Sequence, residues 1–287
     1  MLIATIAIWA LNFTVTRFVL THGFRPLAYS TVRYGIAATL FAAFTYGYER
    51  SFRVRRRDVV LLIAAAAVGI WLNQLSYVYA IRLTNASTTA LILGTTPIFA
   101  ALIAFAIGLE RMSGWFWTAT VVSFGGVALV AAGSGGVSGD VGGDLLGVAT
   151  AATWAAYSVA IAPLMRRYSP YRISAFVLAV GWIAVAVTGA HQLANQSFDL
   201  RWEVWALLAY AVLGPLVLTN ILWFKAVDRV GPSHATLFAN LQPFVAVLFA
   251  VLLLSEHISW LQVLGGVAIA VGIALSRRRG EEEPASP

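Results

Sequence analysis

The chain has 287 residues, of which 60% are hydrophobic and 11% are charged, and its formal net charge is +7. A soluble globular protein carries about 25% charged residues, so this composition excludes an ordinary soluble enzyme and predicts a protein dissolved in lipid. Cysteine is absent, which excludes disulfides and thiolate metal sites, and the basic residues are dispersed between apolar runs, which favours membrane orientation over nucleic-acid binding.

Apolar runs of about 20 residues recur along the whole chain and predict an all-α integral membrane protein. We expect ten membrane-spanning helices, because ten such runs are separated by short loops. In chain order they cover residues 2–20, 27–48, 58–80, 85–108, 114–132, 144–165, 171–190, 203–224, 233–254 and 258–276. The first run has no basic residue ahead of it and no cleavage site followed by a soluble domain, so we interpret it as a span rather than a signal peptide.

The placement of lysine and arginine predicts the orientation of these spans. If the N-terminus is cytoplasmic, 14 of the 19 basic residues fall in cytoplasmic loops or at cytoplasmic span ends. The exceptions are Arg17, Arg25, Arg33, Arg82 and Arg201. Because cytoplasmic loops carry the excess of basic residues, we expect a multi-pass protein of the inner (plasma) membrane with both termini in the cytoplasm.

The chain also repeats itself. At an offset of 145 residues Trp9 matches Trp154, and at an offset of 146 Ser87 and Pro97 match Ser233 and Pro243. We therefore predict a first repeat at 1–132, a glycine-rich linker at 133–143, a second repeat at 144–276 and a charged cytoplasmic tail at 277–287. Since each repeat holds five spans, the second enters the membrane from the opposite face, and such inverted pairs suit alternating access.

Two prolines, Pro97 and Pro243, lie near the middle of the fourth and ninth runs. A proline inside a helix removes one N–H donor and disturbs the carbonyl four residues earlier, here that of Leu93 or Ala239. That carbonyl needs a new partner or lines a cavity. We interpret the two prolines as symmetric hinges; the alternative is a pair of packing kinks fixed by neighbouring helices.

Glu110 and Glu256 close the same two runs, and each stands three residues before a serine. A carboxylate at this position is suited to accept hydrogen bonds from the first N–H groups of a helix. We expect each glutamate to hold its own short turn together by capping the helix that follows it.

Polar side chains inside the apolar runs are candidates for a substrate site, because an amide that faces lipid tails is costly and should look inward. Residues three or four positions apart share a helix face, so mixed polar and aromatic faces are predicted on six of the runs. We expect substrate contacts from Trp9, Asn12, Asn73, Gln74, Tyr77, Thr88, Thr96, Trp154, Tyr157, Asn220, Trp223 and Asn240. The alternative is that the amides and hydroxyls only join helices to one another; their mixture with tryptophan and tyrosine favours a pocket for an amphipathic solute.

Few charged residues lie inside the runs. Arg17 and Arg33 fall in the outer halves of the first two, where either would suit a substrate carboxylate or phosphate, but snorkelling toward the headgroups is the favoured interpretation. No acidic residue lies at mid-membrane, and no histidine and glutamate pair has metal-ligand spacing. The sequence therefore indicates neither an enzyme nor a cofactor, and it leaves the oligomeric state open.

Several stretches resemble the EamA branch of the drug/metabolite transporter superfamily. They are "AIWALNFTVTRF" in the first repeat, "ATWAAYSVAIAPL" in the second, and the proline-to-glutamate pattern that closes the fourth and ninth runs. The resemblance covers nearly the whole chain. It implies a polytopic exporter of small molecules whose polar faces converge on a central cavity between the repeats.

The expected function is therefore transport of a small molecule across a lipid bilayer, by export of amphipathic metabolites such as amino acids. A broad drug exporter would use the same aromatic cavity and stays open. An anionic-metabolite or nucleotide-sugar carrier should place a basic residue deep in the cavity, and the sole lysine, Lys225, lies near a cytoplasmic span end. A membrane-embedded enzyme is the alternative from a different class.

Overall fold

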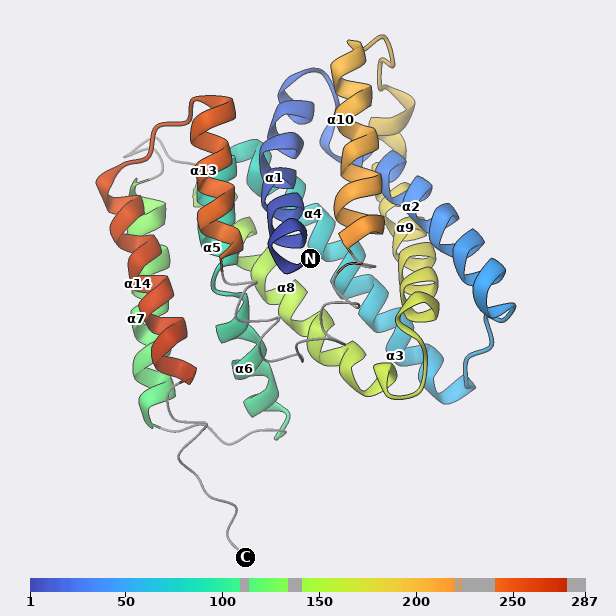
Figure 1. Cartoon of the computed structure of the whole chain (residues 1–287), viewed down its shortest axis with the longest axis horizontal. Coiled ribbons are helices and arrows are strands. Elements are labelled where there is room, and N and C mark those ends of the chain that lie inside the picture. Colours follow the sequence, from blue (N-terminus) through green and yellow to red (C-terminus); the bar gives the residue numbers. More distant parts are fainter. Residues whose placement is uncertain (109–113, 134–140, 220–221, 223–240, 278–287) are drawn as a thin grey trace, which may run out of the picture.

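The computed structural model describes residues 1–108, 114–133, 141–219, 222 and 241–277. Within these ranges every regular element is a helix (Figure 1). The prediction of an all-α protein is confirmed for this part of the chain.

The helices follow the apolar runs. In the first half they are α1 (Leu2–Thr21), α2 (Pro26–Glu49), α3 (Arg56–Ala66), the π-helical segment η1 (Ala67–Leu72), α4 (Asn73–Leu83), α5 (Ala86–Leu93), α6 (Thr96–Ala106) and α7 (Gly114–Gly133). In the second half they are α8 (Val141–Met165), α9 (Pro170–Ala194), α10 (Trp202–Val212), the π-helical segment η3 (Leu213–Leu218), α13 (Gln242–Leu254) and α14 (Trp260–Arg277). Where the described residues cover a predicted run, its bounds agree with the helix to within a few residues.

Six of the described helical stretches are long and apolar enough to cross a membrane. They are Leu2–Thr21, Arg56–Leu83, Ala86–Ala106, Gly114–Gly133, Val141–Met165 and Pro170–Ala194. Trp202–Leu218, Gln242–Leu254 and Trp260–Leu275 are shorter apolar helices. These lengths and compositions are those of a multi-pass membrane protein.

Local sequence explains where several helices begin. Gly23 has a φ of +104°, which a side chain would disfavour, and the chain then turns into α2 with Pro26 in its first turn. Ser169 caps α9 by accepting a hydrogen bond from the Arg172 N–H, and Pro170 follows it.

The two central prolines begin helices rather than interrupting them. Helix α5 ends at Leu93 and α6 begins at Thr96, with Pro97 in its first turn, and Pro243 holds the same position in α13. The carbonyl of Leu93, which Pro97 leaves without its N–H donor, accepts a hydrogen bond of 2.7 Å from the Thr96 hydroxyl. The prediction that this carbonyl needs a new partner is confirmed; Ala239 lies outside the described residues.

The expected role of Glu256 is wrong. The start of α14 is capped by its own residues, because the Gln262 N–H donates to the Ser259 hydroxyl and the Ser259 N–H donates to Gln262 Oε1. The Glu256 carboxylate instead accepts hydrogen bonds from the first residues of α5, 170 positions earlier in the chain. Glu110 lies outside the described residues.

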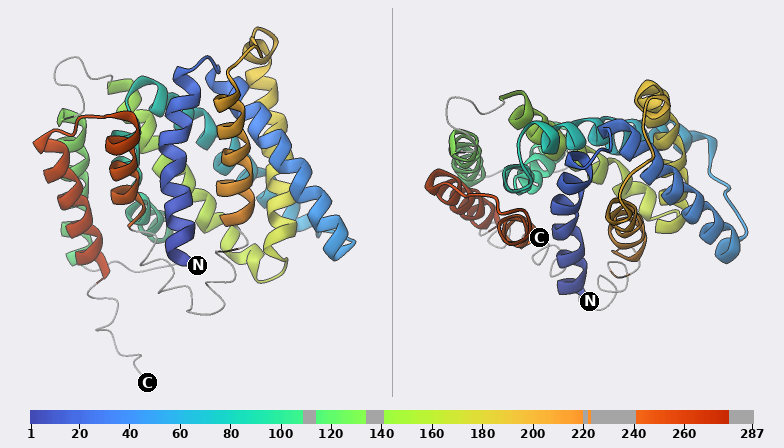
Figure 2. Two further views of the ribbon diagram at one scale, coloured as in Figure 1. Left: turned by 45° about the horizontal axis from the view of Figure 1, so that its top comes forward. Right: turned by 90° about the horizontal axis from the view of Figure 1, so that it is seen from above.

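The helices form a bundle with a tight pair at each edge (Figures 1 and 2). At one edge α7 packs along α14, and at the other α2 packs along α9. A Cβ added at Gly126 of α7 would lie 2.6 Å from the carbonyl oxygen of Gly265 in α14, so only glycine permits this close approach. Between the edges α1, α4 and α8 form the middle of the bundle.

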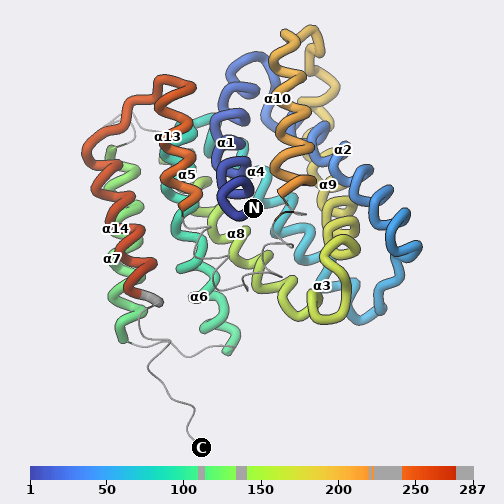
Figure 3. The backbone as a smooth tube through the Cα atoms, in the orientation of Figure 1, coloured from blue at the N-terminus to red at the C-terminus, as the bar shows by residue number. Residues whose placement is uncertain are grey.

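The bundle has two ends, which are easily followed along the backbone tube (Figure 3). We call the end that holds residues 22–25, 195–201 and 255–259 the upper end, and the end that holds residues 50–55 and 166–169 the lower end, as they lie in Figure 1.

Two π-helical segments widen the helical turn inside long helices. Segment η1 joins α3 to α4, and η3 continues α10. The start of η3, Leu213, lies 146 positions after the start of η1, Ala67, which is the offset at which the sequence repeats. Single-turn π-helices often lie next to functional sites, and Asn73 and Gln74 follow η1 directly.

Candidate functional site

Helix α4 presents a polar face to the middle of the bundle. Asn73 and Tyr77 lie one turn apart on it, and both are buried, as is Gln74. Asn73 Nδ2 donates to the Thr150 carbonyl oxygen at 3.0 Å and to the Thr153 hydroxyl at 3.1 Å, both on α8. Gln74 Nε2 donates to Asn73 Oδ1 at 3.4 Å. Helix α4 therefore ties its polar residues to the second half of the chain.

Helix α1 also contacts the polar residues of α4. Asn12 Nδ2 donates to the Tyr77 hydroxyl at 3.1 Å, and the ring of Phe13 meets that of Tyr77 edge-on with centroids 5.7 Å apart. One turn further along α1, the Thr16 hydroxyl is hydrogen-bonded to the Tyr29 hydroxyl of α2 at 3.3 Å. We call these amide and hydroxyl groups of α1, α2 and α4, together with Asn73 and Gln74, the polar band.

Helix α8, which packs against α4, carries two neighbouring aromatic rings. The rings of Trp154 and Tyr157 are 5.3 Å apart and tilted by 40°. Tyr157 covers Gly69 of η1 so closely that a Cβ there would clash with the tyrosine ring. Trp154 is 44% exposed although its helix contacts α4, α5 and α6. The predicted pairing of Trp154 with Tyr157 on one face is confirmed.

Two acceptor atoms in the band have no donor. Asn12 Oδ1 and Gln74 Oε1 are buried and accept no hydrogen bond from the residues that the structure describes. An unpaired polar atom in an apolar interior costs free energy, about 1–3 kcal/mol by mutational measurements. Native proteins rarely leave such groups without a reason, so these oxygens mark the place where a polar guest would be stabilised.

Three of the predicted site residues point elsewhere. Thr88 accepts a hydrogen bond of 3.0 Å from Gln262 Nε2 of α14, and the Thr96 hydroxyl is engaged by the Leu93 carbonyl. The Trp9 indole N–H donates to the Pro215 carbonyl of η3 at 3.2 Å. These contacts join helices or satisfy helix carbonyls. Asn220, Trp223 and Asn240 lie outside the described residues.

Arg33 is a buried charge, which the sequence interpretation did not favour. Snorkelling is the wrong interpretation of this side chain, because the residue is only 3% exposed and its Nε donates to the Ala211 carbonyl of α10 at 3.1 Å. Its guanidinium carbon lies 5.7 Å from the ring centre of Tyr29 and 5.6 Å from that of Tyr34. A signal was present in the sequence, because Tyr29 precedes Arg33 by four positions and therefore shares its helix face.

Arg17 behaves differently. Its Nη1 donates to the carbonyl oxygens of Ile81 at 2.6 Å and Arg82 at 3.0 Å. These carbonyls belong to the last turn of α4, where a cation is favourable. Arg17 is therefore a cap for α4, and of the two arginines only Arg33 adjoins the polar band.

Within the described residues, no group of three or more histidine, aspartate and glutamate side chains is placed to hold a metal ion. The band instead offers hydrogen-bond acceptors, a guanidinium and aromatic rings. Such a set suits reversible binding of a small polar and aromatic solute.

Comparison with known proteins agrees with this chemistry. The model of the EamA-like transporter family matches residues 1–132 and 141–278. The chain belongs to the EamA-like transporter family. As a member, it is a transporter and a multi-pass membrane protein.

The relatives of this EamA-like transporter are distant. "Uncharacterized transporter YyaM" of Bacillus subtilis (strain 168) is 25% identical over 265 residues, which cover 87% of this chain and 84% of the relative. A "probable terminal-alkyne amino-acid exporter" of Streptantibioticus cattleyicolor is 25% identical over 282 residues, covering 97% and 92% of the two chains. A crystal structure aligns with a TM-score of 0.64 at 17% identity over 96% of this transporter and 94% of that chain, which shows a shared fold.

Proposed function

We propose that this transporter exports small amphipathic metabolites, such as amino acids, by alternating access through a central cavity between its two repeats. In this proposal ten helices span the plasma membrane, the repeats cover residues 1–132 and 144–276, and both termini are cytoplasmic. The upper end of the bundle then faces outward. The family assignment, the paired π-helical segments at the repeat offset and the relative named as an amino-acid exporter support the proposal.

The observation that carries the proposal is the pair of donorless oxygens, Asn12 Oδ1 and Gln74 Oε1. Asn12 is near the middle of α1, where a membrane offers no water to bond with an unpaired polar atom. A solute with an ammonium or hydroxyl group satisfies these oxygens, and the neighbouring rings of Phe13 and Tyr77 cover its apolar part. An amphipathic solute therefore matches both halves of this surface.

The roles of the remaining residues belong to the same proposal. Pro97 and Pro243 start helices at the middle of their spans and act as hinges between the upper and lower halves of each span. Substrate contacts come from Asn12, Asn73, Gln74, Tyr77, Trp154 and Tyr157, together with Asn220, Trp223 and Asn240 of the second repeat.

The test is counterflow in liposomes that contain the purified protein. Vesicles are loaded with unlabelled amino acid, and entry of labelled amino acid is followed for aromatic, aliphatic and charged members. Stereoselective uptake of a subset without an imposed gradient is expected, because a carrier exchanges its substrate across the membrane. Absence of counterflow for every amino acid, in protein shown to be folded, would overturn the proposal. Lipophilic drugs and phosphorylated metabolites would then be the next candidate substrates.

Replacement of Asn12 by alanine should abolish this counterflow while the protein still inserts and folds. The variant removes an amide that holds Tyr77 and offers a free oxygen to the solute. Asn195→Ala is the matched control, because that amide is exposed at the end of α9 and donates only to the His191 carbonyl. Equal transport by the two variants, or loss of folded protein in Asn12→Ala alone, would assign Asn12 to helix packing instead.

A further inference from the structure

We propose that Arg33 is the carboxylate-binding residue of the substrate site and that this transporter recognises the zwitterionic group of an α-amino acid. The inference rests on the proposed function and names the chemistry of its substrate. It begins from a charged side chain buried within α2, a helix that the proposed function counts among the ten spans.

The guanidinium of Arg33 has unused donors. A guanidinium carries five N–H groups and no acceptor, and the hydrogen bond from Nε to the Ala211 carbonyl uses one of them. The Tyr29 hydroxyl adjoins the group, and the rings of Tyr29 and Tyr34 cover it. The η nitrogens form no ion pair with any carboxylate of the described residues, since the ion pairs there involve Arg167, Arg172 and Arg201.

A buried cation without a counter-ion is costly in a membrane, and such residues characteristically pair with a substrate or with another ionisable group. Arg33 lies seven residues into α2, about 10 Å below the upper end of that helix. In this proposal the solute supplies the carboxylate that completes the pair. Arginine suits this role because its planar fork binds both oxygens of a carboxylate.

The donorless oxygens supply the complementary half of the site. Tyr77 links the two halves, since its hydroxyl contacts Asn12 and lies within electrostatic reach of Arg33. The oxygens Asn12 Oδ1 and Gln74 Oε1 accept hydrogen bonds only, and an ammonium group donates hydrogen bonds only. A cation donor on α2 and neutral acceptors on α1 and α4 match the carboxylate and ammonium of an α-amino acid, and the rings of Phe13 and Tyr77 beside Asn12 match an apolar side chain.

The experiment compares an acid with its amide. Counterflow of labelled L-phenylalanine into proteoliposomes is measured in competition with unlabelled L-phenylalanine, L-phenylalaninamide, which lacks the carboxylate, and glycerol 3-phosphate. The wild-type protein should favour the acid over the amide by roughly tenfold or more, the effect expected for a charge-assisted bidentate contact. Arg33→Gln should bring that ratio close to one, and Arg33→Lys, which keeps the charge without the fork, should give an intermediate ratio.

Arg17→Gln is the matched control. It removes an arginine from the same end of the bundle that caps α4, so it should reduce the amount of folded protein and leave the ratio unchanged. Equal competition by acid and amide in the wild-type protein would overturn the role of Arg33 while leaving amino-acid transport standing. Stronger competition by glycerol 3-phosphate than by unlabelled L-phenylalanine would overturn recognition of a zwitterion. If neither L-phenylalanine nor any other amino acid shows counterflow, the proposed function itself is overturned. If Arg33→Gln does not fold, the preference for the acid over the amide in the wild-type protein and in Arg33→Lys still tests the role of Arg33.

Discussion

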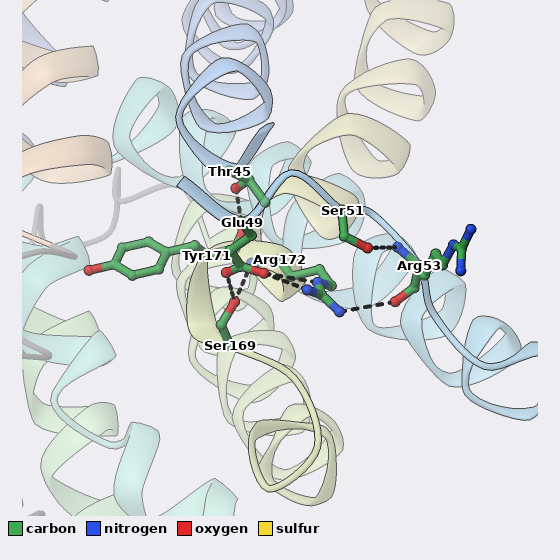
Figure 4. Close-up of polar contacts among 7 residues, drawn as sticks. All are labelled: Thr45, Glu49, Ser51, Arg53, Ser169, Tyr171 and Arg172. Carbon is green, nitrogen blue, oxygen red and sulfur yellow. Dashed lines mark hydrogen bonds and ion pairs between the residues drawn. The ribbon is translucent and has the colours of Figure 1, made fainter. Parts of the chain in front are cut away.

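The two ends of the bundle are held together by different chemistry. At the lower end, residues 45–58 of the first half meet residues 167–172 of the second through ion pairs, and Figure 4 shows the one between Glu49 and Arg172. At the upper end, the halves meet mainly through side chains that cap helix termini. Both sets of contacts join segments more than 100 positions apart in the chain.

Charged groups converge at the lower end. Arg172 donates to Glu49 Oε2 from Nη2 at 2.7 Å and from Nε at 3.0 Å, and Ser169 donates to the other oxygen of the same carboxylate. Beside this pair, Arg167 lies 2.7 Å from Asp58, whose second oxygen accepts a hydrogen bond of 2.7 Å from the Tyr168 hydroxyl. The turn between α8 and α9 is thus clamped to the ends of α2 and α3.

The upper end relies on helix-end hydrogen bonds. The side-chain oxygens of Gln192 and Gln196 accept hydrogen bonds from the N–H groups of Leu27 and Arg25 at the start of α2. The Glu256 carboxylate accepts from the N–H groups of Ala86 and Ser87, each at 3.0 Å, and from the Ser87 hydroxyl. Each contact satisfies backbone donors that a helix start leaves without partners.

The halves of the chain are therefore linked in two ways, by ion pairs at the lower end and by helix caps at the upper end. Removing one partner of an ion pair that is largely shielded from solvent is strongly destabilising, because the remaining charge has no counter-ion. A cap contributes through several smaller hydrogen bonds and through the helix dipole. The lower end should therefore be more sensitive to single substitutions than the upper end.

The largest effect is expected from Arg172→Ala. The variant leaves the Glu49 carboxylate, whose side chain is 12% exposed, without its cation. We expect the free energy of unfolding to fall by about 3 kcal/mol, measured as a lower thermal unfolding midpoint in detergent. Arg166→Ala, an exposed arginine in the same turn, is the control and should leave the midpoint unchanged. The double variant Arg172→Ala with Glu49→Gln should recover part of the loss; a double variant less stable than Arg172→Ala would contradict the ion-pair explanation.

A smaller effect is expected at the upper end from Glu256→Gln. The amide keeps one acceptor oxygen and the size of the side chain but loses the negative charge at the start of α5. The loss should be about 1–2 kcal/mol. Hydrogen exchange of a peptide covering residues 84–93 should speed up in the variant, because the N–H groups of Ala86 and Ser87 lose part of their cap. Unchanged exchange there would show that the cap adds nothing to α5.

Much of the fold follows from the sequence because the length of an apolar run and the residues at its ends are local properties. The position of α2 follows from Gly23 and Pro26, and the break before α6 follows from Pro97. The face of α4 that holds Asn73 and Tyr77 also follows, because residues four apart share a face. The roles of these residues in substrate binding stay predictions.

What the sequence could not predict depends on distant partners. Glu256 caps α5 rather than its own turn, because the choice between two nearby helix starts is made by packing. The Thr96 hydroxyl donates to the Leu93 carbonyl of the preceding turn, as threonine hydroxyls often do, and its place in the substrate site stays a prediction. For Arg33 the neighbouring Tyr29 is visible in the sequence, but the contact with Ala211, 178 positions away, is not, and this contact shows that Arg33 faces the interior.

The smallest effect is expected from Arg201→Ala, which tests whether burial sets the strength of an ion pair. Arg201 and Arg172 both stand near a helix start and both contact a glutamate, and the distance from Arg201 Nη2 to Glu203 Oε1 is 2.6 Å. The Arg201 side chain is 74% exposed, however, whereas that of Arg172 is 23% exposed. An exposed pair gains little over its hydrated ions and must order two long side chains, so Arg201→Ala should produce no resolvable shift of the unfolding midpoint in the same assay. A shift as large as that of Arg172→Ala would mean that burial does not set the strength of these ion pairs, and the reason given for the greater sensitivity of the lower end would fail.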